Sequence, residues 1–276
     1  MKPAPFDYVR AKDLPEALAT LSREQGMVKL LAGGQSLGPM LNLRLARPGL
    51  LVDITRIEAL RQIADTGAAW RIGAGVTHAR IEDMRRRLPG AEMLCRVAAD
   101  IAYRSIRNRG TIGGSLVHAD PAADWQIVLM ALSATVNVKS AQAVRTIPVD
   151  RFVRGAFTTE LAENEIVESI DIPKISQAGR FGYFKFCRKT GEFAEANAAA
   201  VFDPERSIAR MFVGAIGGRP QPLAGLAHEI AKLGATAASK FAISAAVAAA
   251  EPDLDHVGRQ MGSAAVVRAL DQVFNS

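Results

Sequence analysis

Hydrophobic residues in the first quarter of the chain alternate between helical and extended spacing. One set recurs three or four residues apart and predicts a single apolar helix face. This set consists of Leu14, Ala17, Leu18 and Leu21. Asp13 is suited to cap the start of the helix and Gly26 to end it. Short apolar runs at residues 28–32 and 50–54 predict buried strands that follow it.

The middle of the chain continues this mixture and contains one long aperiodic segment. A turn at residues 65–67 predicts a hairpin of residues 63–65 and 69–75. Residues 104–120 are rich in Gly, Asn, Thr and Ser without any period, which predicts a long functional loop. The other expected elements are helices at 78–88, 90–102 and 122–132 and strands at 135–139, 145–149 and 166–172.

A cluster of Pro, Ser, Gln and Gly at residues 173–179 marks the best candidate domain boundary. Three strands without an intervening helix follow it, at residues 182–188, 196–202 and 207–215, and they predict an antiparallel meander. The remainder has helical periodicity, with helices expected from Pro222 onward, at 238–250 and at 262–274. We therefore predict an α+β protein with domains at 1–175 (lobes of roughly 1–55 and 56–175) and 176–276.

Composition restricts the class of protein. The chain has 276 residues, 49% of them hydrophobic and 22% charged, which is typical of a globular protein. No apolar stretch is long enough to span a bilayer, and the N-terminus lacks a secretory signal, so we expect a cytoplasmic protein without a membrane span. The net charge of +6 is not accompanied by dense basic runs with aromatics, so nucleic-acid binding is not expected. The two cysteines have no neighbouring Cys or His at metal-ligand spacing, and no bound metal is predicted.

Two glycine turns, Gly33-Gly34 and Gly113-Gly114, are each followed by a serine. Backbone without side chains lets amide N–H groups approach a diphosphate. The first turn fails the Gly-x-Gly-x-x-Gly dinucleotide pattern at Gln35, so a Rossmann nicotinamide site is not expected. Taken alone, each turn is equally compatible with a tight strand-to-helix turn, in which Ser36 would act as N-cap. Their joint occurrence favours a dinucleotide cofactor.

The region after the second turn adds Asp120 and Asp124, whose carboxylates are suited to ribose hydroxyls, although Asp120 before Pro121 also fits a helix start. Only four histidines occur, and neither a Ser-His-Asp arrangement nor a carboxylate pair is present. No catalytic acid or base is predicted. This points to redox chemistry performed by a cofactor that the protein positions.

Several motifs together resemble one family. They are the segment 31–37, the segment 42–48 (Asn-Leu-Arg-Leu-Ala-Arg-Pro), the segment 106–115 and the segment 119–124. In combination they are similar to the FAD-binding medium subunit of molybdenum hydroxylases, the family of carbon monoxide dehydrogenase and xanthine dehydrogenase. The resemblance implies a two-lobed FAD domain of the vanillyl-alcohol-oxidase (PCMH) type. It also implies a C-terminal domain with a three-stranded antiparallel sheet and a helix bundle.

The resemblance also assigns a set of residues to noncovalent FAD binding. Residues 32–36 and 111–115 would cradle the diphosphate, Asp124 would hold a polar part of the cofactor, and the others would flank or line the site. The set is Leu31, Ala32, Gly33, Gly34, Gln35, Ser36, Leu37, Ile101, Thr111, Ile112, Gly113, Gly114, Ser115, Asp124, Val167 and Lys185. Lys185 is equally compatible with a plain strand lysine. Gln35 stands where the carbon monoxide dehydrogenase branch commonly has His, and Phe193 on the expected flavin-facing loop lacks a tyrosine hydroxyl.

The implied function is an FAD-carrying electron-transfer subunit of a heterotrimer. A large subunit would hold the molybdenum cofactor and a small subunit two-iron, two-sulfur clusters, with two heterotrimers forming a dimer. Two alternatives remain open: a self-contained flavin oxidase of the same fold, with His118 and Cys95 as weak candidates for covalent attachment, and a flavin-free scaffold.

Overall fold

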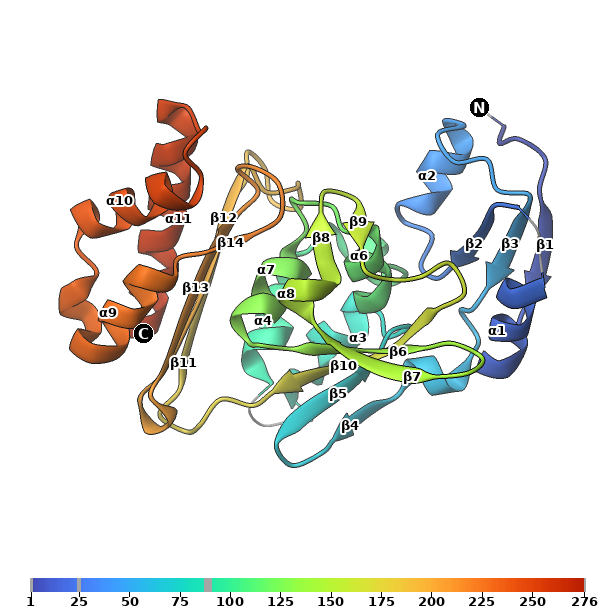
Figure 1. The fold of residues 1–276 in the computed structure, drawn as a ribbon, viewed down its shortest axis with the longest axis horizontal. Helices are drawn as coiled ribbons and strands as arrows, with labels where there is room; N and C mark the ends of the chain where they lie inside the picture. Colours follow the sequence, from blue (N-terminus) through green and yellow to red (C-terminus); the bar gives the residue numbers. More distant parts are fainter. Residues whose placement is uncertain (1, 24–25, 87–90, 276) are drawn as a thin grey trace.

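The computed structural model describes residues 2–23, 26–86 and 91–275. Figure 1 shows three blocks in a row: a small sheet near the N-terminus, a central helix-and-sheet block, and a C-terminal sheet with helices on its outer side. Each block contains its own cluster of buried hydrophobic residues, and the largest cluster lies in the centre. No helix of the described residues is long and apolar enough to cross a membrane.

The first lobe is a three-stranded parallel sheet in the order β1-β3-β2. Its elements are β1 (Asp7–Arg10), α1 (Leu14–Arg23), β2 (Val28–Leu31), α2 (Leu37–Asn42) and β3 (Leu50–Asp53). The predicted start of α1 is confirmed, because Asp13 Oδ1 accepts a hydrogen bond from the Glu16 N–H at 2.9 Å. The sequence did not predict β1, whose four residues are all exposed and show no hydrophobic pattern. Pairing with the buried strand β3 holds it in place.

A buried carboxylate joins β1 to β3. Asp53 Oδ1 accepts hydrogen bonds from the N–H and hydroxyl of Thr55, and its Oδ2 accepts from the Tyr8 hydroxyl and Arg10. Burial alone would raise the pKa of Asp53, but the hydrogen bonds from Thr55, Tyr8 and Arg10 outweigh it and lower this pKa to about 2.

We expect the Asp53 interactions to make the protein acid-sensitive. In the unfolded chain Asp53 takes up a proton near pH 4, whereas in the folded protein it stays ionised down to about pH 2. Its contribution to stability is therefore fully present above pH 4 and is lost as the pH falls towards 2. The shift corresponds to about 2 kcal/mol. Urea unfolding at pH 7 and pH 2.5 should show this loss for wild type and a flatter dependence for Asp53→Asn. An equal pH dependence in both proteins would contradict the assignment.

The central block is a five-stranded antiparallel sheet in the order β4-β5-β10-β6-β7, covered on one face by helices. Its strands are β4 (Ile63–Asp65), β5 (Ala69–Gly73), β6 (Thr135–Lys139), β7 (Val144–Pro148) and β10 (Ile166–Pro173). The predicted hairpin of β4 and β5 is confirmed. The covering helices include α3 (His78–Glu82), α4 (Glu92–Asp100) and α7 (Asp124–Ala131), and all eight residues of α7 are buried. The predicted end of the helix at 78–88, Leu88, and the predicted start of the helix at 90–102, Gly90, lie outside the described residues.

The predicted loop at residues 104–120 is wrong. It contains two short helices, α5 (Arg104–Arg107) and α6 (Ile112–His118). Two glycines at the start of α6 give it poor intrinsic helix propensity. Tertiary contacts and a cap compensate, because the Thr111 hydroxyl accepts the hydrogen bond of the Gly114 N–H at 3.1 Å. Several short connecting elements were not predicted, among them η1 (Glu58–Arg61), α8 (Val149–Phe152) and the paired strands β8 (Val153–Gly155) and β9 (Thr158–Thr159).

The C-terminal sheet has four strands in place of the predicted three, in the antiparallel order β11-β12-β13-β14. The strands are β11 (Arg180–Phe186), β12 (Ala196–Asp203), β13 (Ile208–Gly214) and β14 (Gln221–Pro222). The additional strand is only two residues long, too short for a sequence pattern. One sheet face packs on α9 (Ala224–Leu233) and α11 (His256–Phe274), and α10 (Lys240–Ala250) packs against these two helices. The other sheet face packs on α7.

The last helix begins six residues before its predicted start. Asp255 caps it, with Oδ1 accepting from the Gly258 N–H at 2.7 Å. The sheet is therefore shared between two cores: Ala198 and Ala200 of β12 face the helices, whereas Ala199 and Val201 belong to the central cluster. This places the inner face of β11 and β12 directly beside the start of α7.

Candidate functional site

The first glycine turn, between β2 and α2, presents a run of open backbone donors. Within the described residues, no acceptor takes a hydrogen bond from the backbone N–H groups of residues 32–37. Gly34 adopts a left-handed conformation with φ of 71°, a geometry that directs successive N–H groups into one concavity. Ser36 occupies the predicted N-cap position but makes no side-chain capping bond. The turn is therefore not satisfied as a helix cap and is suited to an anion.

The second glycine turn is bonded differently. The N–H groups of Ile112 and Gly113 donate to the Val76 and Ala74 carbonyls, at 3.1 and 3.0 Å. Those of Gly114 and Ser115 donate to the side chain and carbonyl of Thr111. These four amides are thus engaged within the protein. What this turn can offer a ligand is the Thr111 and Ser115 hydroxyls and a surface without Cβ atoms.

The two turns meet although they are about eighty residues apart in sequence. A Cβ atom at Gly33 would lie 2.2 Å from the Arg109 carbonyl oxygen and 2.8 Å from the Cα of Gly110. One at Gly114 would lie 3.9 Å from the Cβ of Ala32. The two turns therefore form one cradle. From the sequence, a shared site could be inferred only because both turns occur in the same chain.

The base of the cradle rests on the central sheet. A Cβ at Gly113 would lie 2.4 Å from the Cβ of Ala74. The Ala74 N–H in turn donates to the Glu168 carbonyl, at 3.0 Å, beside a register shift of β10. Val167 is the neighbouring residue and is almost fully buried. Its link to the cradle is therefore through the backbone of Ala74 and Glu168.

A buried ion pair lies at the start of α7. Lys185 Nζ is 2.9 Å from Asp124 Oδ1, and both side chains are 7% exposed. The Lys185 ammonium also donates to the Asp100 carbonyl at 2.8 Å, which places it beside Ile101. The Tyr183 hydroxyl donates to the same Asp124 oxygen at 2.6 Å. The structure thus brings together Asp124, Lys185 and Ile101, which the resemblance had assigned separately.

The connection that carries Ile101 is held by an arginine that sequence reasoning did not identify. Arg107 Nη1 donates to the Ile101 and Ala102 carbonyls at 2.9 and 2.7 Å, and Nε donates to Glu82 at 2.9 Å. Ala102 has a φ of 44°, unusual for a residue with a side chain. No sequence signal singled out Arg107, because arginines are frequent in this segment. Tyr183 had a usable signal, since it stands two residues before Lys185 and shares its strand face.

His78 supports the cradle from below. It begins α3, as one reading of the sequence had it, and it is 5% exposed. Nδ1 accepts a hydrogen bond from Trp125 Nε1 at 3.1 Å, and a Cβ at Gly110 would lie 2.9 Å from the ring. Burial, with a contribution from the charge of Arg107, lowers the pKa of His78 to about 4.

We expect His78 to destabilise the protein on mild acidification. The unfolded chain takes up a proton near pH 6.5 and the folded protein only near pH 4, so stability is complete above pH 6.5 and falls as pH drops to 4. The full effect is about 3 kcal/mol. His78→Gln keeps an acceptor for Trp125 but cannot titrate, and its free energy of unfolding should depend less on pH across this window. A matching slope in wild type and variant would refute the prediction.

The chain is similar to known proteins over most of its length. Residues 4–175 match a family model described as the FAD binding domain in molybdopterin dehydrogenase. The alpha subunit of the 6-hydroxypseudooxynicotine dehydrogenase complex of Paenarthrobacter nicotinovorans is 36% identical over 96% of this chain and 90% of that protein. The carbon monoxide dehydrogenase medium chain of Hydrogenophaga pseudoflava is 39% identical over 73% of this chain and 70% of its own length.

Solved structures agree over the whole chain. The carbon monoxide dehydrogenase structure from Hydrogenophaga pseudoflava superimposes with a TM-score of 0.87 at 31% identity, covering 100% of this chain and 99% of that one. Quinoline 2-oxidoreductase from Pseudomonas putida 86 gives a TM-score of 0.88 at 28% identity, covering 99% and 98%. The resemblance inferred from the sequence motifs is confirmed, and the chain belongs to the family of FAD-binding domains in molybdopterin dehydrogenases.

Proposed function

We propose that this chain binds FAD noncovalently and serves as the electron-transfer subunit of a molybdenum hydroxylase. The observation that carries the proposal is the joined cradle: two turns from different lobes in backbone contact, with unused N–H groups on one of them. A diphosphate carries the negative charge and acceptor oxygens that such a concavity lacks. Family membership supports the same cofactor.

At both ends of the site the described residues offer groups suited to FAD. We propose that residues 32–36 hold the diphosphate through backbone N–H groups, and that residues 111–115 contribute hydroxyls and close contact, with Leu31 and Leu37 flanking the turn. Asp124 and Lys185 would hold a polar part of the cofactor, and Ile101 and Val167 would line the apolar part. FAD would supply the capacity to accept electrons and release them singly. The chain would supply position, charge and exclusion of water.

We further propose the assembly that family membership implies. A large subunit would carry the molybdenum cofactor and oxidise the substrate, and a small subunit would relay electrons through two-iron, two-sulfur clusters to this chain. The named relatives include medium subunits of multi-subunit enzymes, such as nicotine 6-hydroxylase. Two heterotrimers would form a dimer in the cytoplasm, and an external acceptor would take the electrons. No group of three or more His, Cys, Asp or Glu suited to a metal occurs among the described residues.

The architecture proposed for this role is a PCMH-type FAD domain over residues 1–175, with lobes at about 1–55 and 56–175, and a C-terminal domain over 176–276. The family model ends at residue 175, which supports this boundary. The sheet of the second domain packs on α7 and so completes the wall that carries Lys185.

The two alternative functions are less well supported. A self-contained oxidase with covalent flavin would need an accessible attachment residue, and Cys95 is buried within the core. His118 is half-buried, with its ring 5.2 Å from that of Phe157, and the acid precipitation described below tests attachment there. A flavin-free scaffold would leave the N–H groups of the half-buried residues 32–36 to water, whereas the family to which the chain belongs is one of FAD-binding domains.

The complex with its partner subunits tests the proposal. We expect a flavin absorbance that is bleached when substrate is added and is restored by an electron acceptor. Acid precipitation should release all the flavin, which would separate this function from a covalent oxidase. A holoenzyme whose medium chain contains no flavin would refute the assignment.

A further inference from the structure

Asp124 uses only one of its two carboxylate oxygens within the protein. Oδ1 accepts from both the Tyr183 hydroxyl, at 2.6 Å, and Lys185 Nζ, at 2.9 Å. No donor among the described residues reaches Oδ2, and this atom is not among the enclosed polar atoms that lack a partner. Lys185 likewise has acceptors for two of its three ammonium hydrogens, Asp124 Oδ1 and the Asp100 carbonyl. One oxygen and one hydrogen of the pair therefore remain available to a ligand.

Tyr183 fixes which oxygen is available. Its side chain extends from β11 into the central core and reaches Asp124 of α7, so the ring cannot rotate away without opening that core. Burial first, and then the negative charge of Asp124, raise the pKa of the Tyr183 hydroxyl well above its usual range. The phenol therefore stays protonated throughout the ordinary pH range and donates a hydrogen bond to Asp124.

A fully buried amide beside this pair indicates that the polar cluster is incomplete in the protein alone. Asn197 lies opposite Lys185 in the strand register and is 0% exposed. Neither polar atom of its side chain has a partner at full hydrogen-bonding geometry among the described residues, although the side chain is close enough to the Tyr183 hydroxyl to lower its pKa slightly. Buried amides are almost always paired with protein, ordered water or ligand. The cluster is thus arranged to be completed by something other than these side chains.

We propose that Tyr183 is a positioning residue that holds Asp124 Oδ1, turns Oδ2 toward the bound cofactor, and thereby sets how readily the flavin is reduced. The inference rests on the proposed FAD site. Hydrogen bonds donated to a carboxylate disperse its negative charge. Without the Tyr183 bond, Lys185 remains as the partner of Asp124. More of the negative charge of this carboxylate then faces the site, and it disfavours the added negative charge of reduction.

The test is a redox titration of the full chain, loaded with FAD, against a reference dye. For Tyr183→Phe we expect the ratio of reduced to oxidised flavin at a fixed potential to fall about fivefold, a part of what a hydrogen bond to a charged group contributes. FAD content is measured in parallel, and the ratio is taken over bound flavin alone. Tyr8→Phe is the matched control, because it removes the same hydroxyl from a buried aspartate, Asp53, in the other lobe. We expect its ratio to be unchanged.

An unchanged ratio in Tyr183→Phe, or an equal shift in Tyr8→Phe, would overturn the inference. A second measurement avoids dependence on the folding of Tyr183→Phe. In a Tyr8→Phe, Tyr103→Phe background Tyr183 is the one remaining tyrosine of the chain's three, and 3-fluorotyrosine then labels it alone. Its fluorine resonance should move when the flavin is reduced, and a stationary resonance would overturn the inference. A wild-type chain that takes up no FAD would instead refute the proposed function itself.

Discussion

Gly33→Ala should reduce the affinity for FAD by about two orders of magnitude. The new Cβ would lie 2.2 Å from the Arg109 carbonyl oxygen, a backbone atom that cannot turn aside. The two glycine turns must then separate, and overpacking of this kind costs about 1–3 kcal/mol, where each 1.4 kcal/mol is a factor of ten in affinity. Fluorescence titration of the full chain with FAD measures the effect directly.

Gly38→Ala provides the matched control for the first prediction. Gly38 lies five residues after Gly33, inside α2, and a Cβ there meets nothing within 4 Å. Alanine also favours helix more than glycine does. We therefore expect wild-type FAD affinity and equal or greater stability. If both substitutions left FAD affinity unchanged, the contact between the turns would have no role in binding.

Lys185→Met should lower the free energy of unfolding by about 3–5 kcal/mol, because it leaves the Asp124 carboxylate buried without its cation. The remaining partner, the Tyr183 hydroxyl, is neutral. FAD retention should fall as well if the pair binds the cofactor. Urea unfolding of the full chain gives the stability, and adding Asp124→Asn in a double-mutant cycle should recover part of the loss.

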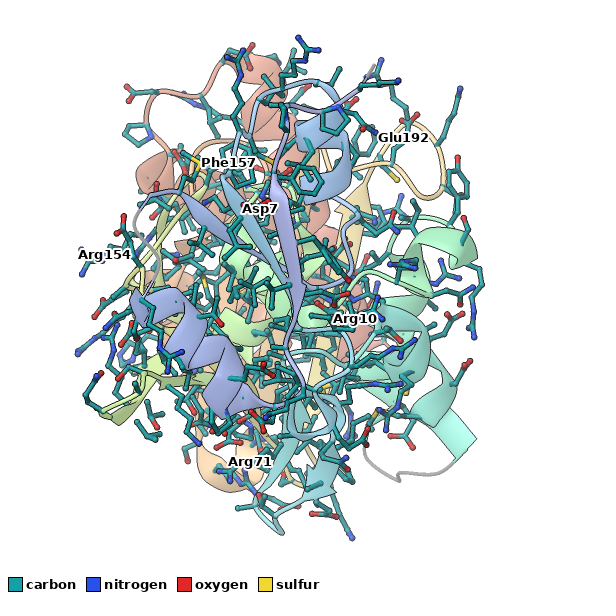
Figure 2. All side chains as sticks on the ribbon, turned by 90° about the vertical axis from the view of Figure 1, so that its right-hand side faces the viewer. Asp7, Arg10, Arg71, Arg154, Phe157 and Glu192 are labelled. Atoms are coloured by element: carbon teal, nitrogen blue, oxygen red, sulfur yellow. The ribbon has the colours of Figure 1, made fainter. Side chains whose placement is uncertain are left out.

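The Arg71–Asp171 ion pair is the exposed control for the buried Lys185–Asp124 pair. Comparing the two shows how much of the loss of stability comes from burial and how much from ion pairing alone. The Arg71–Asp171 pair is bidentate, at 2.7 and 2.8 Å, but the Arg71 side chain is 53% exposed. Figure 2 labels Arg71 near the lower edge of the molecule, far from the labelled Asp7 on β1. We expect Arg71→Met to cost less than about 1 kcal/mol. Similar losses for Arg71→Met and Lys185→Met would contradict the importance of burial.

The difference between predicted and observed elements follows from the range of the forces involved. Helix α1 and the hairpin β4–β5 were predictable because caps, turns and apolar spacing are local. Strand β1 and helix α6 were not, since β1 depends on its pairing with β3 and α6 on the contact of Gly113 with Ala74. Both are formed by residues distant in sequence.

The sequence by itself determined that helices and strands are mixed, which family the chain belongs to, and where the two glycine turns lie, because each of these depends on short contiguous motifs. Only the tertiary structure decided that the turns touch, that open N–H groups belong to the first of them, and that Tyr183 and Arg107 support the site. The reason is physical: which hydrogen bonds a backbone group makes, and which charges are buried together, depend on chain segments that meet only after folding.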